Sequence, residues 1–266
     1  MTRLPDFSRP PVVEVACGVK FRKVPELHGL RISPLYDMWK PELPVIDEQP
    51  ALPSIETGSA GLSPKIFVDF PSLRKTRYWF QSESGSDLVQ LQPDRLIVNW
   101  RNCGNGEEYP RFGYVLNNLS RRVADLSRFV EENFRSKLEI LHVELSYVNS
   151  LHATGSDKWD LGDLFHTWPD FATHHLGRPA NSQMTFDFPI ESARTGKDFF
   201  LRASIEPGEA SDETPGTFLT MTAQGRPSGI SAEAALESIE EAHEHLVLSF
   251  AEITTETAHE RWGKRS

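Results

Sequence analysis

Hydrogen-bonding and aromatic side chains recur along the expected strands, between the apolar positions. In 77–81, 87–92 and 96–101 these side chains are Gln, Asn, Arg and Trp, rather than the Lys and Glu that solubility alone requires. Such residue types hydrogen-bond to or stack on a partner, although a polar outer face is also the ordinary surface of an antiparallel sheet. With members from three further strands, the predicted site for a ligand or partner consists of Glu14, Trp79, Gln90, Gln92, Asn99, Arg101, Glu144 and Arg202.

Two of these residues, Glu14 and Glu144, occupy matching positions in Val-Glu-Val and Val-Glu-Leu strings. If their strands are neighbours, the two carboxylates approach each other on the polar face. One pKa then rises, unless a cation such as Lys20, Arg101 or Arg202 lies between them. A salt-bridged structural network and a carboxylate pair that works in catalysis or binding both fit this pattern.

Motifs that would supply other chemistry are absent from the sequence. It contains no GxxxxGK[ST] loop, no GxGxxG after a strand and no GxSxG elbow. His243 and His245 stand two apart in an expected helix, so they point about 200° apart and cannot share a metal. We expect His243 to pack in the core and His245 to face outwards. The histidines and aspartates between residues 163 and 175 have no diagnostic ligand spacing, so we predict neither metal nor cofactor.

The order of expected elements is the same in both halves of the chain. Alternating and helical periodicities predict a strand, a short helix, three strands and a long helix in each. In the first half these are 12–21, 33–40, 77–81, 87–92, 96–101 and 111–134, with a loop at 41–64 and an extra edge strand at 65–70. In the second half they are 138–151, 161–168, 183–190, 198–206, 217–224 and 232–253.

This repeated order predicts an α+β fold with an internal duplication. Residues 1–136 and 137–266 would form two repeats that share one antiparallel sheet, and the long helices would pack on one face of it. Ser231 is expected to cap the last helix, and Leu246 and Phe250 are expected to be buried against the sheet.

Composition limits the class of partner. The 266 residues carry a formal net charge of −10, which disfavours sequence-independent binding to nucleic acid. The sequence shows no secretory signal and no apolar run long enough to span a membrane. Its two cysteines have no motif spacing and fit a reducing cytoplasm, and Cys17 stands within an apolar run, where we expect it to be buried.

Three segments carry a resemblance. The start 9–15 (RPPVVEV), the segment 91–101 (LQPDRLIVNWR) and the ending AHE…F…T…H..WG together resemble a sporadically distributed prokaryotic family of uncharacterised proteins of similar length. The resemblance brings no activity with it. The patchy distribution of the family implies cargo of mobile elements, such as a component of a defence or toxin–antitoxin-like system.

The sequence features are compatible with three functions. The first is a cytoplasmic binding protein whose polar sheet face, or the groove beside it, takes a small ligand or a protein partner. The alternative is a hydrolase-type enzyme that uses Glu14 and Glu144 in a cleft. The third, recognition of nucleic acid by Arg77, Trp79 and Arg101, is disfavoured by the net charge. An enclosed pocket with perturbed carboxylates would favour the enzyme, and a broad open face would favour binding.

Overall fold

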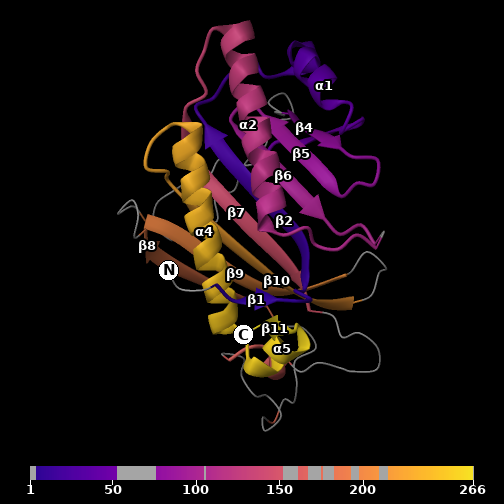
Figure 1. The fold of residues 1–266 in the computed structure, drawn as a ribbon, viewed down its shortest axis with the longest axis vertical. Helices are drawn as coiled ribbons and strands as arrows, with labels where there is room; N and C mark the ends of the chain where they lie inside the picture. The colour runs from indigo at the N-terminus through magenta and orange to yellow at the C-terminus, as the bar shows by residue number, and fades with distance from the viewer. Residues whose placement is uncertain are drawn as a thin grey trace.

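Strands from both halves of the chain pair in one nine-stranded antiparallel sheet (Figure 1). The computed structural model describes residues 4–52, 76–104, 106–151, 161–166, 175, 183–192, 198–209 and 215–265. From edge to edge, the strand order is β3–β4–β5–β6–β2–β7–β10–β9–β8. The strands span Val12–Phe21 (β2), Val45–Pro50 (β3), Thr76–Gln81 (β4), Asp87–Gln92 (β5), Arg95–Arg101 (β6), Ile140–Ser150 (β7), Met184–Glu191 (β8), Asp198–Glu209 (β9) and Pro215–Gly225 (β10).

Apart from the extra edge strand β3, the sheet order is symmetrical about the pair β2 and β7. Each of these strands is flanked by the last strand of its own meander, β6 beside β2 and β10 beside β7. The first strands of the two halves are therefore neighbours, as the matching Val-Glu strings predict. The α+β class and the antiparallel sheet are confirmed.

Two long helices, α2 (Phe112–Phe134) and α4 (Ala232–Ile253), lie on the same face of the sheet (Figure 1). Ser231 caps α4, because its hydroxyl oxygen accepts a hydrogen bond of 3.2 Å from the amide of Ala234. The shorter helical segments are η1 (Gly29–Ile32), α1 (Ser33–Trp39), α3 (Leu161–Leu164) and α5 (Glu256–Arg261). Within the described residues, no helix is both long enough and apolar enough to span a membrane.

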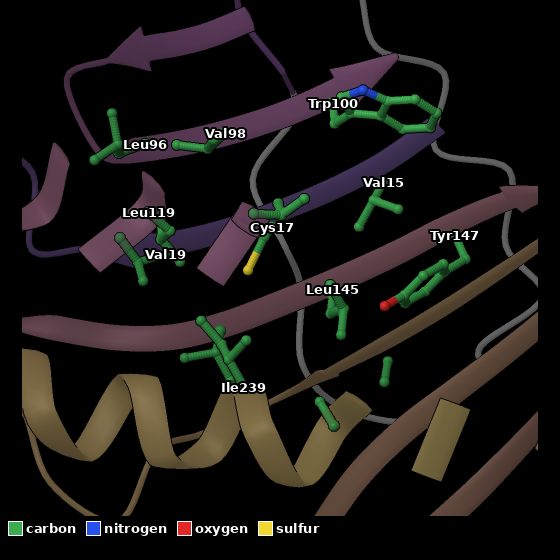
Figure 2. Packing of buried hydrophobic residues seen from close by; sticks show 14 of the residues in the cluster. Val15, Cys17, Val19, Leu96, Val98, Trp100, Leu119, Leu145, Tyr147 and Ile239 are labelled. Carbon is green, nitrogen blue, oxygen red and sulfur yellow. The ribbon is translucent and has the colours of Figure 1, made fainter. Parts of the chain in front are cut away.

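The core lies between the sheet and these helices (Figure 2). Period-2 alternation turns Val15, Cys17 and Val19 of β2 towards this layer, where each is fully buried. Leu119 of α2 and Ile239 of α4 pack into the same cluster. The burial predicted for Cys17 is confirmed. Because Val15, Cys17 and Val19 face the helices, the residues that alternate with them along β2 lie on the opposite face of the sheet.

The structure differs from the sequence prediction at the edge of the first half. The segment expected to be a loop contains β3, which pairs with β4 from Val45↔Gln81 to Pro50↔Thr76. An edge strand needs hydrogen-bond partners on one side only, so a polar segment that ends in proline can form one. The strand predicted at 65–70 and the last two residues of the helix predicted at 161–168 lie outside the described residues.

The packing of the predicted apolar stripe of α4 differs towards its C-terminal end. Leu246 is buried, as expected, but Phe250 is only half-buried. The ring of Phe250 contacts those of Phe7 and Trp262, with centroids 5.6 and 5.1 Å away. Near these rings, β1 (Asp6–Phe7) pairs with β11 (Lys264–Arg265), which joins the two terminal segments. Phe250 thus packs against these segments, a contact that helical periodicity alone does not reveal.

Candidate functional site

The residues predicted for the polar-face site do lie on one face, the one turned away from α2 and α4. The strand registers place Trp79 opposite Gln90, and Glu14 opposite Arg101. Arg202 lies farther along the same face, on β9. The predicted face is thus correct, but several of these side chains are buried or paired within the protein.

A chain of side-chain hydrogen bonds crosses four strands on this face. Arg77 Nη1 donates to Gln90 Oε1 at 2.7 Å, and Gln90 Nε2 donates to Asn99 Oδ1 at 2.7 Å. Asn99 Nδ2 then donates to Glu14 Oε1 at 2.5 Å. Gln90 and Asn99 are buried, so these amides bind one another and are not presented to a partner.

Gln92 is satisfied in a similar way. Its side-chain nitrogen donates to Asp94 Oδ1 at 2.7 Å, and its oxygen accepts from the amide of Leu52 at 3.0 Å. The side chain is buried. The three amides predicted as ligand contacts therefore form hydrogen bonds within the protein.

The predicted carboxylate pair is wrong, although its two strands are adjacent. Glu144 lies opposite Gly18, whereas Glu14 lies opposite Val148, so the two positions are four residues apart along β2. At roughly 3.3 Å per residue this offset is about 13 Å. An antiparallel pair relates matching positions by a two-fold axis, here through Ala16 and Ser146, and both glutamates stand two residues from that axis. Because the axis lies between them, the two glutamates are held apart along the strands.

Each carboxylate has its own surroundings. Burial raises the pKa of Glu14, while the hydrogen bond from Asn99 and the charge of Arg101 oppose the rise. Burial also raises the pKa of Glu144, opposed by the charges of Arg95 and Lys20. The Glu144 carboxylate lies 3.8 Å from Arg95 Nε on β6, on the far side of β2. Gly18 of β2 leaves room for this crossing, because a Cβ there would lie only 3.1 Å from Glu144 Oε1.

Arg202 is paired within the second half of the face. Its Nε and Nη2 atoms donate to the two carboxylate oxygens of Asp187 at 2.7 and 2.9 Å. These hydrogen bonds lower the pKa of Asp187. The pair is largely exposed and joins β8 to β9, so it accounts for Arg202 without a ligand.

A cavity of about 310 Å³ lies on the other side of the sheet, in the helix layer. Its walls come from β7, β10, the start of α2, the C-terminal half of α4 and the segment before β2. Most of its lining is apolar, including Phe112, Met221, Leu246, Val247 and Phe250. An apolar cavity with a few convergent polar groups is the usual form of a small-molecule site.

The polar groups of this cavity form a second hydrogen-bond chain. Tyr109 donates its hydroxyl to the hydroxyl oxygen of Tyr147 at 3.3 Å, and Tyr147 lies 3.0 Å from His243 Nδ1. When Tyr147 donates its own proton to His243 Nδ1, the neutral imidazole carries its proton on Nε2. Tyr147 stands on the same side of β7 as Leu145 (Figure 2).

The low polarity of the surroundings keeps this chain uncharged. Burial lowers the pKa of His243 to about 4, so the imidazole is neutral at pH 7. Burial raises the pKa of Tyr109 to about 12 and raises that of Tyr147 well above its usual value. The His243 ring stacks on Phe112, with centroids 3.9 Å apart. The His243 ring therefore packs against the apolar layer, as predicted, and lines the cavity.

The chain segment before β2 covers one side of the cavity. Arg111, immediately before α2, donates from Nη1 to Asp6 Oδ1 at 3.2 Å and to the carbonyl oxygen of Phe7 at 3.1 Å. Its backbone has a φ of 78°, which costs a residue other than glycine roughly 1–3 kcal/mol. These hydrogen bonds help to stabilise that conformation and connect α2 to the segment that lines the cavity.

Sequence reasoning missed this site because its polar residues lie far apart in the chain. Tyr109 lies in a connecting segment, Tyr147 belongs to the apolar parity of β7, and His243 belongs to the apolar stripe of α4. The available signal was a histidine and a tyrosine on faces otherwise occupied by aliphatic residues. Such residues need a partner when buried, but periodicity does not identify that partner.

The described residues contain no group of three or more His, Cys, Asp or Glu side chains placed to hold a metal. Asp170 and His174, two of the residues weighed for a metal, lie outside them. No family model, no curated protein and no solved structure matches this chain. The resemblance to a prokaryotic family therefore remains a prediction, and the function must be inferred from the geometry of the two faces.

Proposed function

We propose that the protein binds a small, largely apolar molecule in the helix-side cavity, through one hydrogen-bond acceptor on that molecule. The observation that carries this proposal is the Tyr109–Tyr147–His243 chain in the wall of an apolar cavity of about 310 Å³. This volume lies near the lower end of the roughly 300–1,000 Å³ range of small-molecule pockets, so the ligand is small.

The direction of the hydrogen bonds sets the polarity of the ligand. Tyr109 donates to Tyr147, Tyr147 donates to His243, and the remaining proton is on His243 Nε2. Within the described part of the chain, Nε2 has no hydrogen-bond partner. A carbonyl, ether or similar acceptor on the ligand would satisfy this donor. Because the imidazole is neutral, no charge on the ligand is needed.

The hydrolase alternative has less support. It requires Glu14 and Glu144 to work together in a cleft, and they stand four residues apart in register, on the face opposite the cavity. Carboxylates that cooperate in hydrolysis of glycosides are roughly 5–9.5 Å apart. A binding protein is therefore the function that the arrangement favours, with a cavity rather than the polar face as its site.

Two probes of the same shape test the proposal. Acetophenone carries a carbonyl acceptor, and α-methylstyrene has a methylene group in place of the carbonyl oxygen. We expect the protein to bind acetophenone about tenfold more tightly, because one net hydrogen bond contributes about 1.4 kcal/mol. Dissociation constants from titrations followed by NMR measure this preference.

Variants test whether the Tyr109–Tyr147–His243 hydrogen-bond chain causes this preference. The double substitution Tyr147→Phe/His243→Phe removes both partners of one hydrogen bond, keeps an aromatic ring at each position and leaves the Tyr109 hydroxyl without its acceptor, so we expect it to fold with some loss of stability and to lose the preference for acetophenone. Val247→Phe fills the cavity and should weaken both probes. His245→Gln, on the same helix but outside the cavity lining, is the matched control and should bind like the wild type. Equal affinity of wild type and double variant for acetophenone would refute the proposed role of His243.

A further inference from the structure

A cluster of two arginines and a tryptophan lies on the polar sheet face, across the sheet from the cavity. The guanidinium carbons of Arg77 and Arg101 lie 5.4 and 5.6 Å from the centre of the Trp79 ring. Arg77 and Trp79 belong to β4, and Arg101 comes from β6. All three side chains are half-buried, which places two cations against one aromatic ring.

Neutral groups hold both guanidinium groups in place. Arg77 donates to the amide oxygen of Gln90 at 2.7 Å, and Gln90 is fixed in turn by the chain to Asn99 and Glu14. Arg101 Nη2 donates to Gln81 Oε1 at 2.8 Å and to the carbonyl oxygen of Gly85 at 2.9 Å. Both positions are therefore fixed without any acidic group being used.

The charges of the two arginines are left uncompensated at close range. Among the described residues, neither guanidinium forms an ion pair. Glu14 lies opposite Arg101 in register, but its carboxylate accepts from Asn99, and it acts on Arg101 only through longer-range attraction. Burial and the charge of Arg95 lower the pKa of Arg77, which reflects a local excess of positive charge. Half-buried cations in proteins are normally paired.

The same cluster contains three N–H donors that lack an acceptor. Arg77 Nε, Trp79 Nε1 and Arg101 Nε are buried and have no hydrogen-bond partner within the described residues. On the same face, the side chains of Gln90 and Asn99 do have hydrogen-bond partners, whereas His142 Nδ1 and Glu144 Oε1 lack one within the described residues. Three N–H groups without a partner therefore lie in this cluster, and the described residues supply no acceptor for them.

We propose that Arg77, Trp79 and Arg101 bind the phosphate group of a small molecule. Two fixed cations favour a dianion over a carboxylate, and a phosphate monoester offers three acceptor oxygens to the two guanidinium groups. Guanidinium groups match phosphate geometry in particular. The net charge of −10 on the whole chain repels a long polyanion, so a small phosphate ester or diphosphate fits better than nucleic acid. This site is independent of the cavity on the helix side.

Calorimetric titration with pyrophosphate at constant ionic strength tests the site. We expect the wild type to bind pyrophosphate, and Arg77→Gln/Arg101→Gln to weaken that binding at least tenfold. Arg202→Gln is the matched control, because Arg202 lies on the same face but already pairs with Asp187. It should bind within twofold of the wild type. Absence of binding to the wild type, or equal binding by the double variant, would overturn the proposal.

Two further measurements keep the result interpretable. Trp79→Phe keeps an aromatic ring but removes the indole N–H and one fused ring, so we expect severalfold weaker binding of pyrophosphate and only a small drop in the thermal midpoint. Unchanged affinity would remove Trp79 from the site. A single-stranded oligothymidylate of ten nucleotides is the second probe. If it binds more tightly than pyrophosphate and its binding is lost in the double arginine variant, the cluster is a nucleic-acid site and the assignment to a small phosphate is wrong.

Discussion

Phe80→Ala is expected to lower the free energy of unfolding by about 3–5 kcal/mol. Phe80 is fully buried on β4, where its ring stacks on Tyr36 and meets Trp39 edge to face, with centroids 5.8 and 5.4 Å away. Trp39 in turn donates from Nε1 to Asp125 of α2 at 3.1 Å. Removal of the Phe80 ring would therefore leave a cavity where β4, α1 and α2 meet.

Denaturant unfolding measures this loss. Phe188→Ala provides the matched control, because Phe188 on β8 is 40% exposed and its removal leaves no enclosed cavity. We expect the control to lose less than about 1 kcal/mol. A similarly small loss for Phe80→Ala would mean that α1 does not cover the sheet as described.

The second large effect is a loss of stability in acid that originates at His243. Burial lowers the pKa of His243 from 6.5 to about 4, so the unfolded chain takes up a proton at a higher pH than the folded protein does. The contribution of His243 to the free energy of unfolding is constant above pH 6.5. It decreases as the pH drops from 6.5 to about 4, and it changes little below that. The shift corresponds to about 3 kcal/mol.

Comparison of two unfolding series isolates this contribution from the other titrating groups. Burial also lowers the pKa of His142, which adds to the loss, and raises the pKa of Glu14 and Glu144, which opposes it. Tyr147→Phe/His243→Phe removes only the His243 contribution. Between pH 6.5 and 4 we expect the wild type to lose about 3 kcal/mol more than this double variant. Parallel curves would show that His243 is not buried in its neutral form.

Much of the fold could be predicted from local pattern. The strand Val12–Phe21, the strand Asp87–Gln92 and the helix Ala232–Ile253 have the expected bounds, since each has a clear period and flanking turn or cap residues. The pairing of β2 with β7 was predicted from matching Val-Glu strings. The internal duplication itself remains a prediction, because sequence similarity between the halves is confined to those strings.

The candidate sites depend on register and depth, which periodicity does not contain. The parity of Gln90 and Asn99 was correct, but their burial and mutual hydrogen bonds come from cross-strand neighbours. The offset between Glu14 and Glu144 follows from the position of the two-fold axis, which a match between strings does not fix. In the polar wall of the cavity, Tyr147 and His243 meet because α4 packs on β7, and Tyr109 reaches Tyr147 from the segment before α2.

The nitrogen-15 spectrum of the His243 side chain tests the central claim most directly. With His243→Gln used to assign its signals, we predict a neutral ring with the proton on Nε2, and a pKa of about 4. Saturating acetophenone should shift the Nε2 resonance, because the ligand accepts its proton, and should leave the signals of His245 in place. A ring that titrates near pH 6.5, or an Nε2 resonance that acetophenone does not move, would contradict the proposed binding site.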